Sequence, residues 1–249
     1  KAGGNAIDAA IACALVQTVV DPQMCGIAGF GSLQIFKKHQ AEHLVLDFHG
    51  RAPLSAREDM WEHLIEGETE DGFGFILKGR VNDVGYGSIT TPMSLRAYND
   101  ALFQYGTMSL EELLEPAINY AENGFMIRPH VNYFWNQVEG AGRVPHIERV
   151  TKIPATRKIY VKEDGSVRKP GEILRNPDMA KTYRTIAKKG IDTFYKGEIA
   201  KVIAGDMENN GGLLSLEDLK NVEVTKTTPL ISEYRDYKIA TNRPPGGGI

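Results

Sequence analysis

The pattern of apolar and polar positions begins with a helix. Apolar residues recur at helical spacing from Ile7 to Val19, and Pro22 ends the run because the residue before a proline disfavours helix. Asn5 has a side chain suited to cap the first turn, and Asp8 is favourable at the positive end of the helix dipole. The segment is rich in alanine, so neighbouring elements can approach it closely. We expect a buried helix.

Alternating positions predict two strands after this helix. The strands cover residues 32–36 and 42–48, and the polar residues 37–40 join them as a hairpin. The hairpin leads into His49, Gly50 and Arg51. Loops at strand ends display binding groups on a rigid scaffold, and a guanidinium suits a carboxylate. A lone arginine on a loop is more often solvated than functional, so both interpretations stay open.

The rest of the chain is mostly helical in pattern, with short strands between the helices. Turn residues separate the predicted elements, and no internal repeat is visible. We expect a long loop with short strands over 67–86, a variable connection over 140–154, a small hairpin over 159–167 and two strands around a turn at 235–236. The predicted helices cover residues 57–66, 91–105, 109–122, 130–138, 176–189 and 197–209.

Several glycines lie between the first helix and the first strand, within residues 24–31. A dinucleotide-binding fingerprint needs a strand before its glycines and a helix after them, because the pyrophosphate meets the helix N-terminus. The order here is the reverse. The glycines therefore indicate a tightly packed corner rather than a nucleotide site.

Composition and charge narrow the classes of function. The 249 residues are 42% hydrophobic and 24% charged, with a net charge of −3 spread along the chain, which is typical of a soluble globular protein of one large domain or two small ones. There is no basic stripe for nucleic acid, and no apolar run approaches the ~20 residues that span a bilayer. The chain starts at Lys1 without a signal peptide and looks open at both ends, so the compartment, whether cytoplasmic, periplasmic or extracellular, stays open.

The cysteines and histidines do not have the spacing of a metal or cofactor site, and we expect neither metal nor cofactor. Cys13 is expected to be a small buried hydrophobe. Cys25 as a nucleophile would need a nearby base, which makes that the minor interpretation. His130 and His146 are more typical of core or surface histidines than of ligands. The carboxylates are scattered, so no glycosidase-type pair can be nominated.

Nine stretches, in order from end to end, resemble the large subunit of the γ-glutamyltransferases, a family whose precursor cuts itself into a large and a small subunit. No single stretch is diagnostic, but nine in the family order make coincidence a poor explanation. The stretches are residues 3–10, 26–31, 46–48 with 52–53, 105–108, 123–125, 194–197, 210–213, 234–237 and 244–249.

This resemblance implies an α/β (α+β) fold, namely part of the αββα sandwich of the N-terminal-nucleophile hydrolases, rich in helices. It implies that residues 1–249 form a single domain, an incomplete large subunit. The partner would be a small subunit whose N-terminal threonine is the nucleophile and whose own amine is the base. That threonine would lie beyond Ile249, so the resemblance implies no catalytic residue in this chain.

The chain departs from the glutathione-cleaving members at one position. In them an arginine follows the Asp-Phe of the second strand and pairs with the α-carboxylate of the γ-glutamyl group. Here that position is His49, and the arginine is Arg51, in a Gly-Arg-Ala-Pro arrangement like that of divergent members. Two extended residues span several ångströms, at ~3.3 Å each, so the guanidinium would be displaced. The resemblance implies that Arg51, with His49, binds an anionic group on a substrate that need not be γ-glutamyl.

Three hypotheses follow for function. The first is an amidase or acyltransferase in which a threonine attacks an amide and the acyl group passes to water or an amine. The second is a non-catalytic scaffold or degenerate paralogue that lacks the nucleophile. The third, an unrelated redox or metal protein, is weak because the cysteines and histidines are poorly spaced for it.

Overall fold

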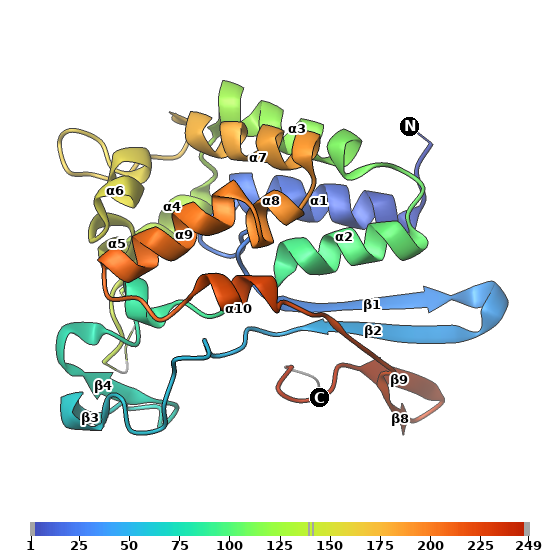
Figure 1. Ribbon diagram of the computed structural model, residues 1–249, viewed down its shortest axis with the longest axis horizontal. Helices are drawn as coiled ribbons and strands as arrows, with labels where there is room; N and C mark the ends of the chain where they lie inside the picture. The colour runs from blue at the N-terminus through green and yellow to red at the C-terminus, as the bar shows by residue number, and fades with distance from the viewer. Residues whose placement is uncertain (1–2, 139, 141, 247–249) are drawn as a thin grey trace.

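A small antiparallel sheet lies beneath a stack of helices (Figure 1). The computed structural model describes residues 3–138, 140 and 142–246, and the expectations for Lys1, Ala2 and residues 247–249 lie outside this part. Strand β1 (Gly31–Lys37) pairs with β2 (Glu42–Phe48), which confirms the predicted hairpin, and β7 (Thr225–Thr227) pairs with the other side of β2. The order is therefore β1-β2-β7, with strands from opposite ends of the chain side by side.

The helices form two levels above this sheet. Helices α1 (Ala6–Val20) and α2 (Ser94–Tyr105) are near the strands, and α3 (Leu110–Asn123) with α7 (Pro177–Lys189) covers α1 from above (Figure 1). One core joins these levels. Its fully buried members include Leu15 of α1, Leu46 of β2, Leu114 of α3 and Tyr183 of α7.

Helix α1 begins and ends as the pattern predicted. The Asn5 side chain accepts hydrogen bonds from the amides of Ile7 and Asp8, and the helix ends at Val20. The expectation of full burial is wrong, because α2 and α3 cover one side and leave Ala9, Ala10 and Cys13 exposed. Cys13 is therefore not the buried hydrophobe that the sequence predicted.

Asp8 fastens the start of α1 to the turn between α2 and α3. Its side chain is buried, and its oxygens accept from the amides of Asn5 (2.7 Å), Thr107 (2.9 Å) and Met108 (3.1 Å) and from the Thr107 hydroxyl (2.6 Å). Burial alone would raise the pKa of Asp8, but these hydrogen bonds favour the ionised form and lower it to about 2. Gly106 permits this approach, since a Cβ there would lie 2.8 Å from Asp8 Oδ1.

The helices with clear caps lie where the sequence placed them. Ser109 and Glu112 form a capping box at the start of α3, and Asn176 caps α7. Gly190, at a positive φ of 78°, ends α7. The predictions for α4 (Pro129–Asn136) and α9 (Glu198–Asn209) are confirmed to within two residues at each end.

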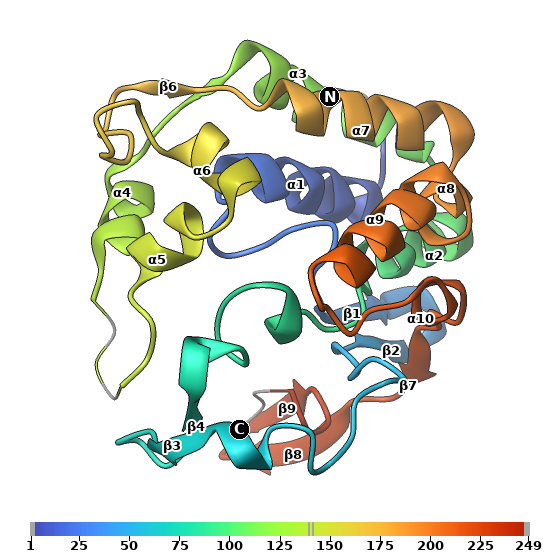
Figure 2. The ribbon, with the colours of Figure 1, turned by 60° about the vertical axis from the view of Figure 1, so that its left-hand side comes forward.

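The predicted helix over 57–66 is wrong. This segment holds a 3₁₀ turn (Glu62–Leu64) followed by β3 (Ile65–Glu68), which pairs with β4 (Phe75–Leu77) at the end of the molecule far from α3 and α7 (Figure 2). The apolar residues before Ile65 supply only one turn of helical spacing. β-branched Ile65 followed by Gly67 then favours extended backbone. The expected loop with short strands over 67–86 is confirmed by this hairpin.

Two segments contain more helix than the sequence pattern predicted. Helix α5 (His146–Thr151) lies inside the expected variable connection, and α6 (Pro154–Tyr160) takes the first residues of the expected hairpin over 159–167. Pro154 suits the first turn of a helix because its missing N–H would be unpaired there anyway. Only a single bridge between Val161 and Val167 remains of that hairpin.

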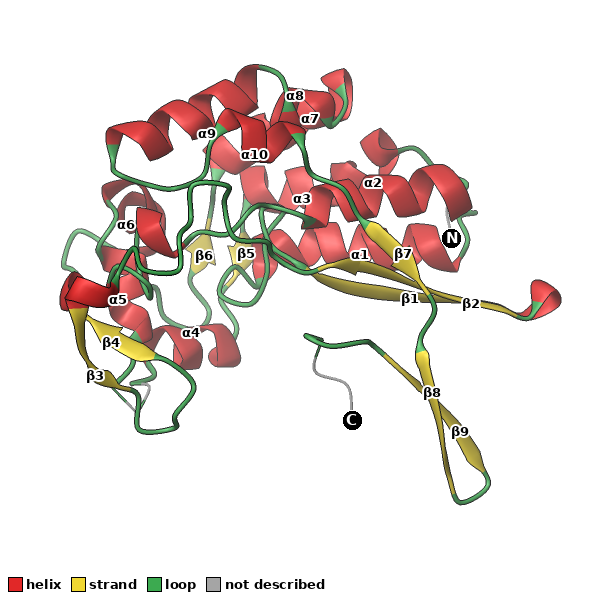
Figure 3. Cartoon of the chain, turned by 60° about the horizontal axis from the view of Figure 1, so that its bottom comes forward, coloured by secondary structure: helices red, strands yellow, loops and turns green. Residues whose placement is uncertain are grey.

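The C-terminal third contains short elements that the pattern did not predict. These are α8 (Asp192–Tyr195), α10 (Leu216–Lys220) and β7. In the middle of the chain, β5 (Phe125–Met126) pairs with β6 (Ile173–Leu174). The predicted turn at Arg235 is confirmed, between β8 (Leu230–Tyr234) and β9 (Tyr237–Thr241), and this hairpin extends away from the helices (Figure 3). Within the described ranges, no helix combines the length and apolarity needed to cross a membrane.

Candidate functional site

The loop that follows β2 carries both residues that the sequence nominated. Asp47, near the end of β2, accepts hydrogen bonds through Oδ1 from the His49 amide (3.0 Å) and pairs with Nδ1 of the His49 ring (2.7 Å). Burial raises the pKa of Asp47, but the hydrogen bonds from His49 and the charges of His49 and Arg51 outweigh it and hold the pKa below its ordinary value. Because Nδ1 is held by Asp47, Nε2 is the ring nitrogen left for another partner.

Arg51 lies two residues further along and is exposed. Its carbonyl accepts from the Thr91 amide at 2.9 Å, which fixes the backbone, whereas its guanidinium makes one long hydrogen bond, from Nη2 to Thr225 Oγ1 at 3.4 Å. No ion pair joins Arg51 to a carboxylate within the part of the chain that the structure describes. The cationic fork is therefore available to an anionic ligand.

The bend between the two residues is tightly packed. A Cβ on Gly50 would lie 2.5 Å from Thr90 Oγ1 and 3.2 Å from the Phe30 ring. On the other side, Gly246 lies beside the His49 ring, at 3.2 Å between a Cβ placed there and Cε1. His49 and Arg51 thus lie on one short loop, and the C-terminal end of the described chain, at Gly246, lies beside the His49 ring.

Cys25 does not have the surroundings of a nucleophile. Burial, and secondarily the charge of Asp21, raise the pKa of the thiol to about 11, and its sulfur contacts the Asp21 carbonyl at 3.8 Å. The thiolate, which is the reactive form, is therefore suppressed near neutral pH. The described residues hold no group of three His, Cys, Asp or Glu side chains arranged for a metal. His130 instead lies 3.7 Å from Asp21, and the ring of His146 packs against Phe134.

We expect a Cys25→Ser variant of the full-length protein to keep its activity, because the thiol is held protonated. We also expect Cys25 to resist a thiol reagent at pH 8, since a pKa of about 11 leaves roughly one molecule in a thousand as thiolate. Labelling followed by peptide mass mapping checks this. Rapid labelling of Cys25, or loss of activity in the serine variant, would contradict the assignment.

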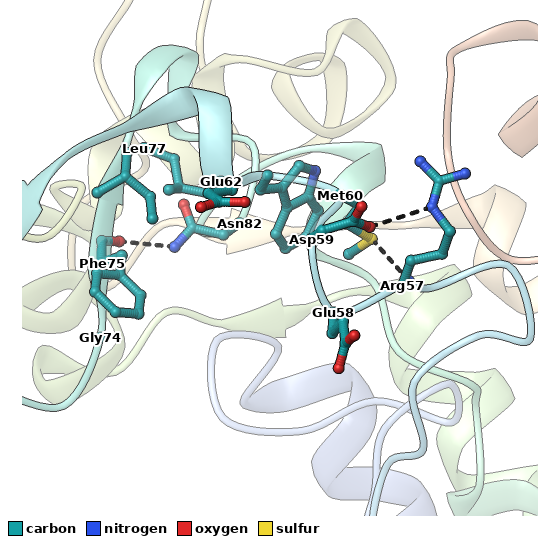
Figure 4. Close-up of a pocket in the computed structure, with 11 residues that line it drawn as sticks. Arg57, Glu58, Asp59, Met60, Glu62, Gly74, Phe75, Leu77 and Asn82 are labelled. Atoms are coloured by element: carbon teal, nitrogen blue, oxygen red, sulfur yellow. Dashed lines mark hydrogen bonds and ion pairs between the residues drawn. The ribbon is translucent and has the colours of Figure 1, made fainter.

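A hollow lies elsewhere, between residues 57–62 and the β3–β4 hairpin (Figure 4). It has a volume of about 620 Å³, and apolar Trp61 and Phe75 line it together with the carboxylates of Glu58 and Glu62. Neither His49 nor Arg51 is among the lining residues. Sequence reasoning missed this hollow because it expected a helix over 57–66. The site predicted from the sequence and this hollow are thus different places on the chain.

The chain is similar in sequence to known proteins along its whole length. The family model for Gamma-glutamyltranspeptidase matches residues 1–249. The chain is 32% identical over 248 residues to a glutathione hydrolase proenzyme of Bacillus subtilis (strain 168), covering 100% of this chain and 39% of that protein. It is 33% identical over 247 residues to an acylase ACY 1 proenzyme of Pseudomonas sp. (strain V22), covering 98% and 41%. The chain thus spans about two-fifths of the length of these relatives.

Solved structures agree with this picture. The γ-glutamyltranspeptidase of Helicobacter pylori superimposes with a TM-score of 0.84 and 32% identity, over 98% of this chain and 64% of that one. A cephalosporin acylase from Bacillus halodurans gives a TM-score of 0.78 at 28% identity, over 96% and 42%. The mixed helix and strand architecture is therefore that of N-terminal-nucleophile hydrolases.

Proposed function

Because this chain belongs to the γ-glutamyltranspeptidase family, we propose that it is the large-subunit part of an amidase or acyltransferase. In the proposed reaction a threonine hydroxyl attacks the carbonyl carbon of an amide, an ester to the enzyme forms, and the amine leaves with a proton. Water or a second amine then displaces the threonine oxygen and releases the acyl group. A small subunit outside this chain would supply the threonine, whose own amine would take up the proton.

In this proposal Arg51 binds an anionic group of the substrate. The observation that supports it is that Arg51 is exposed and its guanidinium has no ion pair to a carboxylate in the described ranges, while its backbone carbonyl is held by the Thr91 amide at 2.9 Å. Such a fork can make two parallel hydrogen bonds to a carboxylate. His49 would add Nε2 as a further polar contact, because Asp47 occupies Nδ1.

The substrate class follows from the position of that arginine. The resemblance to glutathione-cleaving members would place an arginine at residue 49, where this chain has histidine. A guanidinium that starts two residues later reaches an anionic group at a different distance from the scissile bond. We therefore assign an anionic acyl donor without requiring γ-glutamyl, in keeping with relatives that are named both as glutathione hydrolases and as acylases.

The partner proposed for this chain is the small subunit of the same precursor. Among the residues that the structure describes, β1 and β7 are the outer strands of the sheet, and the β8–β9 hairpin stands apart from the helices. Exposed strand edges present unpaired backbone groups that a further strand can satisfy. The 249 residues would on this account be one incomplete domain that is completed by strands of the small subunit.

The test is to assay the full-length precursor on a γ-glutamyl anilide and on anilides of other acids, with and without a carboxylate. The proposal expects hydrolysis of at least one anilide that bears a carboxylate on its acyl group. The alternative, a scaffold or degenerate paralogue, expects no hydrolysis of any. Absence of activity together with absence of a threonine-led small subunit in the gene would replace the proposal by that alternative.

A further inference from the structure

The loop that carries Arg51 is tied at its far end to a distant part of the chain. Oδ1 of Asp218 accepts a hydrogen bond from the Leu54 amide at 2.7 Å, across 164 positions of sequence. Asp218 belongs to α10 and is 5% exposed, whereas Leu54 itself is an exposed residue of the loop. A buried carboxylate is costly unless its oxygens are paired, so each contact it makes matters.

Asp218 makes more contacts than a helix cap requires. Its other oxygen, Oδ2, accepts from the Ser215 amide at 2.8 Å and the Ser215 hydroxyl at 2.6 Å, which completes the capping box of α10. That function uses one oxygen only. The second oxygen joins the cap to the loop after β2, and the Ser55 hydroxyl adds a bond to the Leu213 carbonyl at 2.9 Å.

The near end of the same loop is fixed independently. Asp47 accepts from the His49 amide, and the Arg51 carbonyl accepts from the Thr91 amide. Asp218 then holds the amide three residues after Arg51. The segment after α10 also reaches the side chain, because Thr225 of β7 lies 3.4 Å from the Arg51 guanidinium. The backbone around Arg51 is therefore held on both sides, and one of the two holds depends on Asp218.

We propose that Asp218 is a positioning residue for Arg51, which joins α10 to the anion-binding loop and fixes where the guanidinium is presented. This inference rests on the proposed function of Arg51. It follows from the demands of a bidentate contact, since misplacing a binding group by about 1 Å can cost up to ~10²-fold in rate. Asp218 would act through the loop and not through contact with substrate.

The test uses the full-length precursor and two single variants, Asp218→Ala and Ser215→Ala. Both remove contacts of the α10 cap, but only the first removes the acceptor of the Leu54 amide. For an amide with a carboxylate on its acyl group, we expect Asp218→Ala to raise KM by about tenfold or more, with a smaller change in kcat. We expect Ser215→Ala to leave KM near the parent value, and Asp218→Asn, which keeps one acceptor oxygen, to lie between the parent and the alanine variant.

A double-mutant cycle with Arg51→Ala shows whether Asp218 acts through the arginine. In the Arg51→Ala background, we expect Asp218→Ala to have little further effect on KM, because the group that it positions is gone. The same increase in KM in both backgrounds would overturn the inference and leave Asp218 a general structural role. If Arg51→Ala alone had no effect on any substrate, the proposed function of Arg51 would fail first.

Hydrogen exchange separates those two failures without using activity. We expect the Leu54 amide to exchange faster in Asp218→Ala than in the parent, while core amides of α3 and α7 keep their protection. Unchanged exchange of the Leu54 amide would overturn the positioning role of Asp218 even if Arg51 binds substrate. Where the alanine variant does not yield folded precursor, Asp218→Asn serves for the same exchange measurement, with a smaller increase expected at Leu54.

Discussion

Replacing Asp8 by alanine is expected to lower the free energy of unfolding by about 3 kcal/mol or more. The carboxylate accepts from three backbone amides and one hydroxyl at the junction of α1 with the α2–α3 turn. Without it those amides lose their partners in a partly buried place, and each buried donor left unsatisfied costs about 1–3 kcal/mol. Urea unfolding followed by circular dichroism measures the change. A loss below about 1 kcal/mol would contradict the role given to this network.

The same residue gives a pH dependence of defined sign. The pKa of Asp8 in the folded chain is lowered to about 2, against an ordinary value of about 3.9, so the folded state favours the ionised form. The contribution of Asp8 to the free energy of unfolding is fully present above about pH 4 and is lost as the pH falls through about 2. We expect Asp8→Asn to be less stable at pH 6 and to lose less stability than the parent between pH 4 and 2. Glu208→Gln, at an exposed carboxylate of α9, is the control and should follow the parent.

Replacing Arg51 by alanine in the full-length precursor is expected to lower kcat/KM about 10²-fold for amides whose acyl group bears a carboxylate. A bidentate charge-assisted pair is lost, and a hundredfold change corresponds to about 2.7 kcal/mol. An amide with a neutral acyl group should change little, because it never made the contact. Arg51→Lys keeps the charge but not the planar guanidinium. Its kcat/KM for the amide with a carboxylate should lie between those of the parent and Arg51→Ala. Steady-state kinetics on a matched pair of anilides measures this.

Arg57→Ala is the matched control for that experiment. Arg57 lies on the same connection between β2 and β3, its side chain is 75% exposed, and it is 3.5 Å from Asp59. We expect Arg57→Ala to leave kcat/KM unchanged for both the charged and the neutral anilide. Equal losses on the charged and the neutral anilide in Arg51→Ala, or equal losses in Arg51→Ala and Arg57→Ala, would remove the anion-binding role.

Much of the helical fold could be predicted because its signals are local. Asn5, Ser109 and Asn176 cap helices through amides two or three residues away, so the pattern that predicts each helix also contains the cause of its start. The β1–β2 hairpin has the same advantage, since its partner strand follows after a short turn. The family resemblance then added what no local pattern contains, the layered arrangement and the expectation of a partner subunit.

The failures come from contacts between distant parts of the chain. Strand β7 is three residues long, and its extended state depends on pairing with β2, about 180 positions away in sequence. The contact of Asp218 with the Leu54 amide could not be found from sequence spacing, because the two residues are 164 positions apart. Cys13 looked like a core residue, but α2 and α3 cover only one side of α1. For the site, the sequence nominated Arg51 and His49, and their role in binding stays a prediction.

The intact mass of the full-length precursor after purification tests most directly whether the protein cleaves itself. We expect two polypeptides whose masses sum to that of the precursor plus one water, because self-cleavage hydrolyses one peptide bond. The second polypeptide should begin with threonine, and its replacement by alanine should leave a single uncut chain. One uncut chain in the parent protein, with no amide hydrolysis, would contradict the central claim that this chain is the large-subunit part of a self-cleaving amidase.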